Sequence, residues 1–222
     1  MTRLDASAHL YRCDVLWRDD RVIVVNKPSG LAVHRGWASD PVVAVSLVRR
    51  VVRGRVHPVH RLDRGTSGAL MFALDSETAS LLQLLFRDQD IDKRYLALVR
   101  GVPPDEGVID HPVPRKPGGP RVDAVTRFRR LATVHGRYSL VEAAPRTGRL
   151  HQIRRHLKHL SHPLVGDTGY GDGRVNRDAR ALAFPHPHTG ERVEVSAPPP
   201  DDLRVPLERM GFDPALWADP PG

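Results

Sequence analysis

The stretch at residues 60–74, HRLDRGTSGALMFAL, constrains the fold more than any other part of this sequence. Its last six residues are apolar and predict a short buried strand. Its first five residues carry one carboxylate, two guanidiniums and an imidazole. Because burying an unpaired ion costs several kcal/mol, Asp63 must either stay in water or lie beside a cation. The chain must therefore turn sharply from a charged segment into the core.

Arginines supply the candidate partners for Asp63. Arg61 and Arg64 flank it, and three more arginines lie on or beside a helix predicted at residues 147–160. An arginine within reach keeps a carboxylate ionised, and an ionised aspartate in an apolar pocket is a candidate nucleophile. A structural ion pair is the alternative, and spacing alone favours it.

Strands outnumber helices in the pattern of the whole chain. β-Branched and alternating residues predict strands at residues 22–25, 69–74, 94–101, 124–134, 137–145 and 191–198. Helical spacing predicts one helix at residues 76–88, capped by Asp75 or Ser76, and a second at 147–160, capped by Thr147. Residues 107–121 are rich in Pro and Gly and are expected to form an exposed loop. Hairpin connections beside helical ones favour an α+β fold.

The length of 222 residues allows one substantial domain. We expect an extension at residues 1–14, a single domain at 15–197 and a loosely packed, Pro-rich tail at 198–222. No apolar run reaches the roughly 18 residues that span a bilayer, and the N-terminus lacks a signal-peptide core. The single cysteine, Cys13, excludes an internal disulfide and a multi-cysteine metal site. These features predict a cytoplasmic protein with no membrane contact.

The charge balance points to a polyanionic partner. There are 34 Lys+Arg against 26 Asp+Glu, a formal net charge of +8, and nearly all the basic residues are arginine. Arginine suits bidentate phosphate contacts, so nucleic acid is the partner that this composition favours. The alternative is a GC-rich genome, which enriches arginine whatever the function.

Two further features are candidates for chemistry. Tyr95, in KRYLALVRG, has a phenol that can stack on a base or move a proton, although a strand tyrosine is more often core. Four histidines crowd RLHQIRRHLKHLSH, namely His151, His156, His159 and His162. No HExxH pattern accompanies them and no carboxylate sits at ligand spacing, so we expect a partly solvated helix face and no metal site.

Three of these segments together resemble a known family. HRLDRGTSG, KRYLALVRG and RTGRLHQIRRHLKHLSHPLVGDTGYG occur in that order and are similar to the core motifs of the RluA-type pseudouridine synthases. NKPSGLAVH resembles that family's opening strand and turn. VHRGW, AVTRFRRLATV and GDGRVNR look most like its tRNA pseudouridine synthase C branch. The resemblance runs from about Val15 to Ala197, and no S4 RNA-binding module precedes it.

The resemblance implies a fold and an activity. The fold would be a long, mixed, mostly antiparallel sheet with flanking helices and a central RNA-binding cleft. The activity would be isomerisation of a tRNA uridine, at position 65 for the C branch, to its carbon-linked isomer. No metal, nucleotide or redox cofactor is implied, and a monomer is the family expectation.

The resemblance also implies roles for single residues. Asp63 matches the catalytic aspartate, Arg154 the arginine that pairs with it, and Tyr95 the tyrosine that stacks on uracil and takes the carbon-5 proton. Arg61 matches the residue that fills the gap left by the flipped base. The expected RNA-binding residues are Arg61, Arg64, Lys27, His34, Arg149, His151 and Gln152.

One stretch departs from the family pattern. GDGRVNRD runs directly into ARALAFPHPHTGE, without the leucine and histidine that the family carries in the approach to this strand. Three other functions stay open on these motifs. A ribosomal RNA synthase would use the same catalytic residues, a non-catalytic RNA-binding factor would use the same scaffold, and a metal hydrolase would use the histidines.

Overall fold

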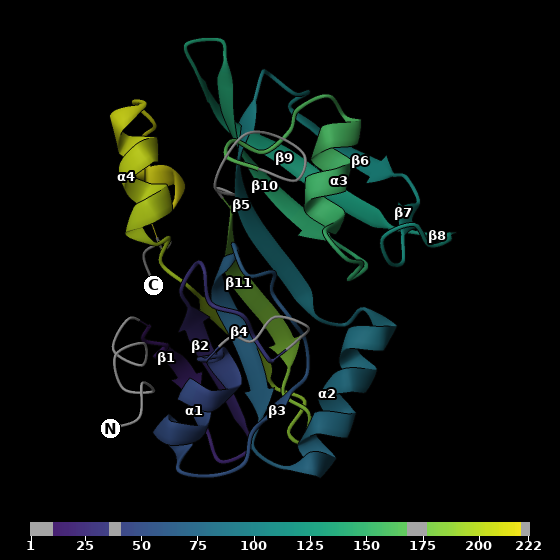
Figure 1. Cartoon of the computed structure of the whole chain (residues 1–222), viewed down its shortest axis with the longest axis vertical. Helices are drawn as coiled ribbons and strands as arrows, with labels where there is room; N and C mark the ends of the chain where they lie inside the picture. The colour runs from purple at the N-terminus through teal and green to yellow at the C-terminus, as the bar shows by residue number, and fades with distance from the viewer. Residues whose placement is uncertain (1–10, 36–40, 168–176, 219–222) are drawn as a thin grey trace. The chain divides into compact units, whose positions relative to one another are not determined.

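The computed structural model describes residues 11–35, 41–167 and 177–218. The chain divides into two compact units, which are described separately below. Unit 1 comprises residues 1–91 and 181–197, and unit 2 comprises residues 92–180 and 198–222. The sequence predicted a single domain at residues 15–197 and gave no linker at these boundaries. The units meet at three points of the chain (Figure 1): one falls directly between a helix and the next strand, one falls inside a strand, and the third, between residues 197 and 198, is where the predicted tail begins.

The main sheet has ten strands. Eight follow the order β1-β2-β4-β11-β5-β10-β9-β6, while β12 pairs with β11 and β3 with β4. Their bounds are β1 Asp14–Arg18, β2 Val22–Lys27, β3 His57–Pro58, β4 Ser67–Ala73, β5 Asp92–Arg100, β6 Glu106–Asp110, β9 Val125–Val134, β10 Tyr138–Pro145, β11 Arg177–Pro185 and β12 Arg192–Ser196. A separate two-stranded sheet joins β7 (Val113–Pro114) to β8 (Arg121–Val122).

The described residues also form four α-helices and one 3-10 helix. They are α1 (Ala44–Val52), α2 (Ser76–Asp88), α3 (Gln152–His159), α4 (Asp201–Arg209) and η1 (Pro214–Leu216). A large sheet with flanking helices confirms the predicted α+β class. Within the described ranges, no helix is both long enough and apolar enough to cross a membrane.

Unit 1 is built around two strands that are almost completely buried. β2 begins with four buried β-branched residues, and all seven residues of β4 are buried. The two strands pair antiparallel, with Val24 opposite Met71. Helix α2 begins as predicted, because Asp75 accepts a hydrogen bond from the backbone N–H of Thr78 at 2.8 Å. Its buried residues Ala79 and Leu82 join the same core.

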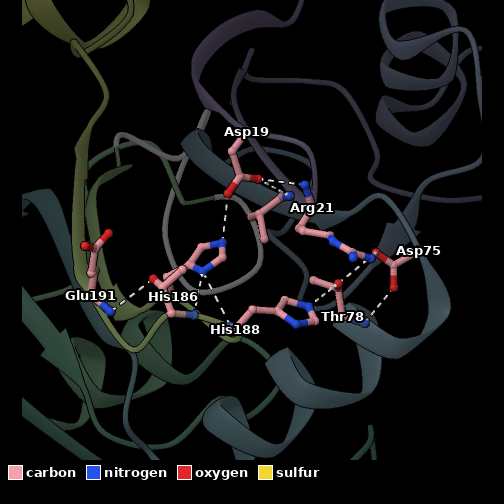
Figure 2. A network of polar contacts seen from close by, with 9 residues as sticks. Asp19, Arg21, Asp75, Thr78, His186, His188 and Glu191 are labelled. Carbon is pink, nitrogen blue, oxygen red and sulfur yellow. Dashed lines mark hydrogen bonds and ion pairs between the residues drawn. The ribbon is translucent and has the colours of Figure 1, made fainter.

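A polar network ties three turns of unit 1 together (Figure 2). His186, which follows β11, lies with Nε2 2.8 Å from a carboxylate oxygen of Asp19, in the turn between β1 and β2. His188 lies with Nε2 2.9 Å from the hydroxyl of Thr78, and that hydroxyl donates to Asp75 at 2.8 Å. The segment HPHTGE between β11 and β12 is therefore held both to the start of α2 and to the β1–β2 turn.

Unit 2 places a helix on each face of β5, β10 and β9. On one face, Ile153 and Leu157 of α3 pack against a cluster that includes Ala97, Val141 and Phe128. On the other face, α4 packs against Leu96, Leu98 and Leu140. The alternation of side chains along the strands explains both layers, because consecutive residues point to opposite faces.

Three sequence predictions about unit 2 need correction. The tail from Pro198 is not loose: α4 and the residues after it bury Leu203, Leu207, Phe212 and Trp217. The loop predicted at residues 107–121 is partly regular, since β6 and the β7–β8 hairpin occupy much of it. The helix predicted from residue 147 begins at Gln152, because Thr147 bonds to the side chain of Gln152 instead of capping a helix turn.

Candidate functional site

Asp63 lies in unit 1, in the segment between β3 and β4, here called the Asp63 loop (residues 59–66). Leu62 is buried, Asp63 is half-buried, and Arg61 and Arg64 are exposed. The backbone N–H of Thr66 donates to the carbonyl of Asp63 at 3.0 Å. This bond closes a turn immediately before β4. The chain thus leaves a charged, partly solvated segment and enters a buried strand within four residues, as the sequence required.

Lys27, the last residue of β2, holds this loop by hydrogen bonds from its side chain. Its side chain has no exposed surface. Its Nζ donates to the carbonyl oxygens of Pro28 at 2.9 Å, Leu31 at 2.8 Å and Arg64 at 3.2 Å. An ammonium has three N–H donors, so these carbonyls offset the cost of burying the charge. Lys27 is among the residues predicted to bind RNA, and this stays a prediction; in the structure its ammonium faces the backbone of the loop and has no solvent surface.

Two more contacts hold the same loop. The backbone N–H of Gly30 donates to the carbonyl of Arg64 at 2.8 Å. The backbone N–H of Met71 donates to Nε2 of His60 at 2.9 Å, and the His60 ring lies 4.9 Å from that of Phe86. Because Nε2 accepts this bond, the hydrogen-bond network assigns the proton of neutral His60 to Nδ1. Both ends of the loop are thereby attached to core elements of unit 1.

Tyr95 lies on β5 of unit 2. It pairs in register with Ala143 of β10 and packs, half-buried, against the apolar cluster beneath α3. The sequence left two interpretations of Tyr95 open, a tyrosine of the core and a tyrosine that stacks on a base. A half-buried ring at the margin of a core leaves part of its surface able to meet a ligand.

Arg154 forms a two-pronged pair with Asp167 in unit 2. Nε donates to Oδ2 at 2.7 Å, and Nη2 donates to Oδ1 at 2.6 Å. The side chain of Asp167 is 1% exposed and that of Arg154 is 12% exposed. Bidentate guanidinium–carboxylate bonds are short and orientationally strict, so this pair fixes where Arg154 points. The pairing of Arg154 with Asp63 stays a prediction.

Sequence reasoning missed Asp167. Asp167 lies in VGDTGYG, the end of the third family motif, a stretch in which the sequence predicted no site residue. An aspartate thirteen residues after an arginine carries no periodic signature, because the pairing depends on how the chain turns back after the helix.

Gln152, another residue of the predicted RNA-binding set, lies at the start of α3. It is 4% exposed. Its amide nitrogen donates to the carbonyl of Val125 at 3.0 Å and to the hydroxyl of Thr126 at 2.9 Å. Its amide oxygen accepts from the hydroxyl of Thr147 at 2.7 Å and from the backbone N–H of Arg149 at 3.0 Å. With its donors and its oxygen used in this way, Gln152 orders the start of α3, and its contact with RNA stays a prediction.

The other predicted RNA-binding residues differ in exposure. His34 and Arg149 are exposed, as are Arg61 and Arg64, whereas His151 is half-buried. Arg149 Nε donates to the carbonyl of Asp123 at 3.1 Å. His151 occupies the left-handed region with φ 54°, directly before the first residue of α3. Arg149 and His151 thus lie in the loop that Gln152 orders.

The histidines of the α3 region do not converge. His156 is fully buried, with Nδ1 2.9 Å from the hydroxyl of Thr126 and Nε2 2.9 Å from the carbonyl of His111. Desolvation lowers the pKa of His156 below its ordinary value. The ring of His159 stacks on that of His111 at 3.7 Å. Over the described parts of the chain, no group of three or more His, Cys, Asp or Glu side chains could hold a metal ion.

Residues 21–159 match the protein family described as RNA pseudouridylate synthase. The chain belongs to this family. The tRNA pseudouridine synthase C of Haemophilus ducreyi is 41% identical over 218 residues, which cover 83% of this chain and 90% of that protein. The tRNA pseudouridine synthase C of Vibrio parahaemolyticus is 35% identical over 238 residues, covering 91% of this chain and 97% of that protein. These relatives confirm the family predicted from the sequence motifs.

Solved structures of the pseudouridylate synthase family share the fold. The structure titled Human RNA Pseudouridylate Synthase Domain Containing 4 has a TM-score of 0.75 and 28% identity, covering 88% of this chain and 92% of that one. Human RNA Pseudouridylate Synthase Domain Containing 1 has a TM-score of 0.74 and 26% identity, covering 92% and 98%.

The alignment to the Haemophilus protein also bears on the departure from the family pattern. Its 218 aligned residues cover only 83% of a chain of 222, so some residues of that relative have no counterpart here. The predicted departure concerns the approach to β11. Residues 168–176 lie outside the described residues, and β11 itself begins at Arg177.

Proposed function

We propose that this chain converts one uridine of tRNA to pseudouridine. The observation that carries the proposal is the identity of 41% and 40% to two proteins named tRNA pseudouridine synthase C, each matched over 90% of its length. The formal net charge of +8 supports a polyanionic substrate such as tRNA. Position 65, a monomeric state and a cytoplasmic location belong to the same proposal.

The proposed reaction breaks one bond and forms another on the same ribose. The bond from uracil N1 to ribose C1′ breaks, and a bond from uracil C5 to C1′ forms. C5 loses a proton and N1 gains one, so the reaction is balanced without an oxidant or reductant. The protein therefore has to supply a nucleophile, a means of holding the freed base and a proton acceptor.

Asp63 is the proposed nucleophile. Asp63 is half-buried at a turn, and Lys27 and Thr66 hold the backbone on its C-terminal side. A nucleophile benefits from a fixed backbone, because small displacements from productive geometry cost rate. Tyr95 is the proposed stacking partner of uracil and acceptor of the C5 proton. Arg154, oriented by Asp167, is the proposed cation that keeps the aspartate ionised.

The test is release of tritium from tRNA transcripts labelled at uracil C5. The native chain is compared with Asp63→Ala and with Asp90→Ala, a matched control because Asp90 is exposed and carries the same charge. The proposal expects release by the native chain and by Asp90→Ala, no release by Asp63→Ala, and a product that maps to one position. Equal release by Asp63→Ala would remove Asp63 from its role.

The same assay separates the other functions that the motifs left open. Release from ribosomal RNA fragments and not from any tRNA would favour a ribosomal RNA synthase. Tight tRNA binding with no release from either substrate would favour a non-catalytic RNA-binding factor. Inhibition of release by a chelator would reopen a metal-dependent reaction.

A further inference from the structure

Four arginines gather at the end of α1 in unit 1, and none of them belongs to the candidate site. Arg49 and Arg50 lie in the last turn of the helix, Arg53 follows its last residue, and Arg55 lies two residues further on. All four side chains are exposed. We call them the α1 arginine cluster. Figure 1 shows α1, with the segment after it leading to β3.

Among the described residues, the α1 arginine cluster has no carboxylate partner. None of its four side chains makes an ion pair or hydrogen bond with another described residue. Some exposed arginines elsewhere in the described chain do pair with carboxylates: Arg87 with Asp88, Arg192 with Glu194, and Arg204 with Asp201 and Glu208. Others, such as Arg127, Arg137 and Arg146, do not, so the cluster is distinguished by having four such arginines within seven residues. The surrounding sequence explains the difference, because residues 21–62 contain seven arginines and one lysine but a single acidic residue, Asp40.

Helix stability does not account for the cluster. A cation in the last turn interacts favourably with the helix macrodipole, but this effect falls off within that turn. One or two of the four arginines would suffice, and Arg55 lies beyond the end of the helix. Bringing four like charges together within seven residues costs repulsion, which counter-ions or a polyanion must offset. An unpaired group of guanidiniums is chemically suited to phosphate oxygens.

The α1 arginine cluster precedes the Asp63 loop in the chain, and the start of α1 is held by the segment that also contacts this loop. The first turn of α1 is held by backbone bonds from Ala44 to the carbonyl of Ala32 at 2.8 Å and from Val45 to that of Val33 at 3.0 Å. Gly30 and Leu31 come just before Ala32 in the chain. The backbone of Gly30 bonds to the Asp63 loop, and the carbonyl of Leu31 accepts a bond from Lys27, which holds that loop. A nine-residue helix is about 13 Å long, so the arginines at its far end lie well beyond this attachment.

We infer that the α1 arginine cluster is a phosphate-binding surface for the RNA substrate, separate from the groups that act on the uridine. The inference rests on the proposed function, because it takes the polyanion to be the same tRNA. The cluster binds the backbone of nucleotides other than the target and adds affinity without reading sequence. Its contribution falls with rising salt, since each contact releases condensed counter-ions.

The test measures how tRNA affinity depends on salt concentration. The variant Arg49→Gln/Arg50→Gln/Arg53→Gln/Arg55→Gln removes the cluster. The matched control Arg87→Gln/Arg129→Gln/Arg192→Gln/Arg204→Gln removes four exposed arginines that each pair with a carboxylate. Both variants change the net charge equally, so a difference between them reports position and not total charge.

The expected result is a smaller salt slope for the cluster variant alone. With about 0.7–0.9 in slope per phosphate contact, loss of four contacts lowers the slope of log affinity against log salt by about 3. The affinity at low salt falls by at least about tenfold, the loss appearing in KM more than in turnover at saturating tRNA. The corresponding fourfold Arg→Lys variant restores most of the slope.

Two results would overturn the inference. One is a cluster variant whose slope equals that of the native chain. The other is a slope that falls equally in the control, which would make the effect one of total charge. If the fourfold variant is poorly folded, Arg53→Gln/Arg55→Gln, which lies outside the helix, should lower the slope by about half as much. Tritium release by the native chain tests the proposed function independently. If the native chain isomerises uridine but the salt slopes do not differ as expected, the inference about the α1 arginine cluster is wrong and the proposed function still holds.

Discussion

Arg154 and Asp167 are joined by two parallel hydrogen bonds, of 2.7 Å and 2.6 Å, and the Asp167 side chain is almost completely buried. The guanidinium therefore has its direction set by a carboxylate that solvent does not reach. Such a pair is more useful for orientation than for stability, because desolvating both charges offsets much of their attraction. We interpret Asp167 as the residue that positions Arg154.

Replacing Arg154 with lysine should destabilise the protein and slow the proposed reaction. Lysine supplies a point charge that cannot reproduce both hydrogen bonds, so buried Asp167 loses one of its two bonds from residue 154, at a cost of about 1–3 kcal/mol. Urea denaturation measures the free energy of unfolding, and tritium release measures the rate. The control is Arg155→Lys, since Nη1 of Arg155 donates to the carbonyl of Pro114 at 2.8 Å, a bond that a lysine ammonium can also make. Equal stability of the two variants would contradict the orienting role.

Replacing Lys27 with methionine should loosen the Asp63 loop. The change keeps the length of the side chain but removes the donors to the three carbonyls, which costs about 3 kcal/mol in unfolding free energy. Because one of those carbonyls belongs to Arg64, we also expect a lower kcat with little change in KM. The control is Lys116→Met, at an exposed turn between β7 and β8. A normal kcat for the Lys27 variant would show that the loop keeps its geometry without the ammonium.

His156 should make stability fall at mildly acidic pH. Desolvation lowers the pKa of His156 in the folded protein, so the unfolded chain binds the proton first as pH falls below about 6.5. The stability is present above that pH and is lost as pH falls toward the folded-state pKa. We expect His156→Gln, whose amide can serve Thr126 and the carbonyl of His111, to flatten this loss between pH 7 and pH 5. Urea midpoints across that range measure it, with His34→Gln, at an exposed site, expected to behave like the native chain.

Helix α4 should be essential to unit 2. Leu207 is fully buried against the β5–β10 face, so Leu207→Ala should cost about 2–5 kcal/mol in unfolding free energy. Arg209→Ala, at an exposed position of the same helix, should have little effect. Thermal melting distinguishes the two. A Leu207→Ala variant with the same melting temperature as the native protein would contradict the packing of α4 and support a loosely packed tail.

Local patterns determined much of the fold. Asp75 followed by apolar residues at helical spacing predicted α2 with its correct bounds, and the β-branched run at Val22 predicted β2. These elements can be predicted from sequence because their patterns of polar and apolar residues involve only residues close along the chain. The loose tail was predicted wrongly because prolines at its start suggested irregular structure. Its burial depends on Leu207 and Trp217 meeting a distant sheet face.

The sequence alone determined the family, through three long motifs, and with it the candidates Asp63, Tyr95 and Arg154. Only the tertiary structure decided what the polar residues around them do. Lys27 and Gln152 look like ligands for RNA in a linear sequence, yet both are buried and bonded to backbone far along the chain. Residue type and spacing specify which chemistry is available. Whether a charge meets solvent, a carbonyl or a second charge depends on long-range packing, which local sequence does not encode.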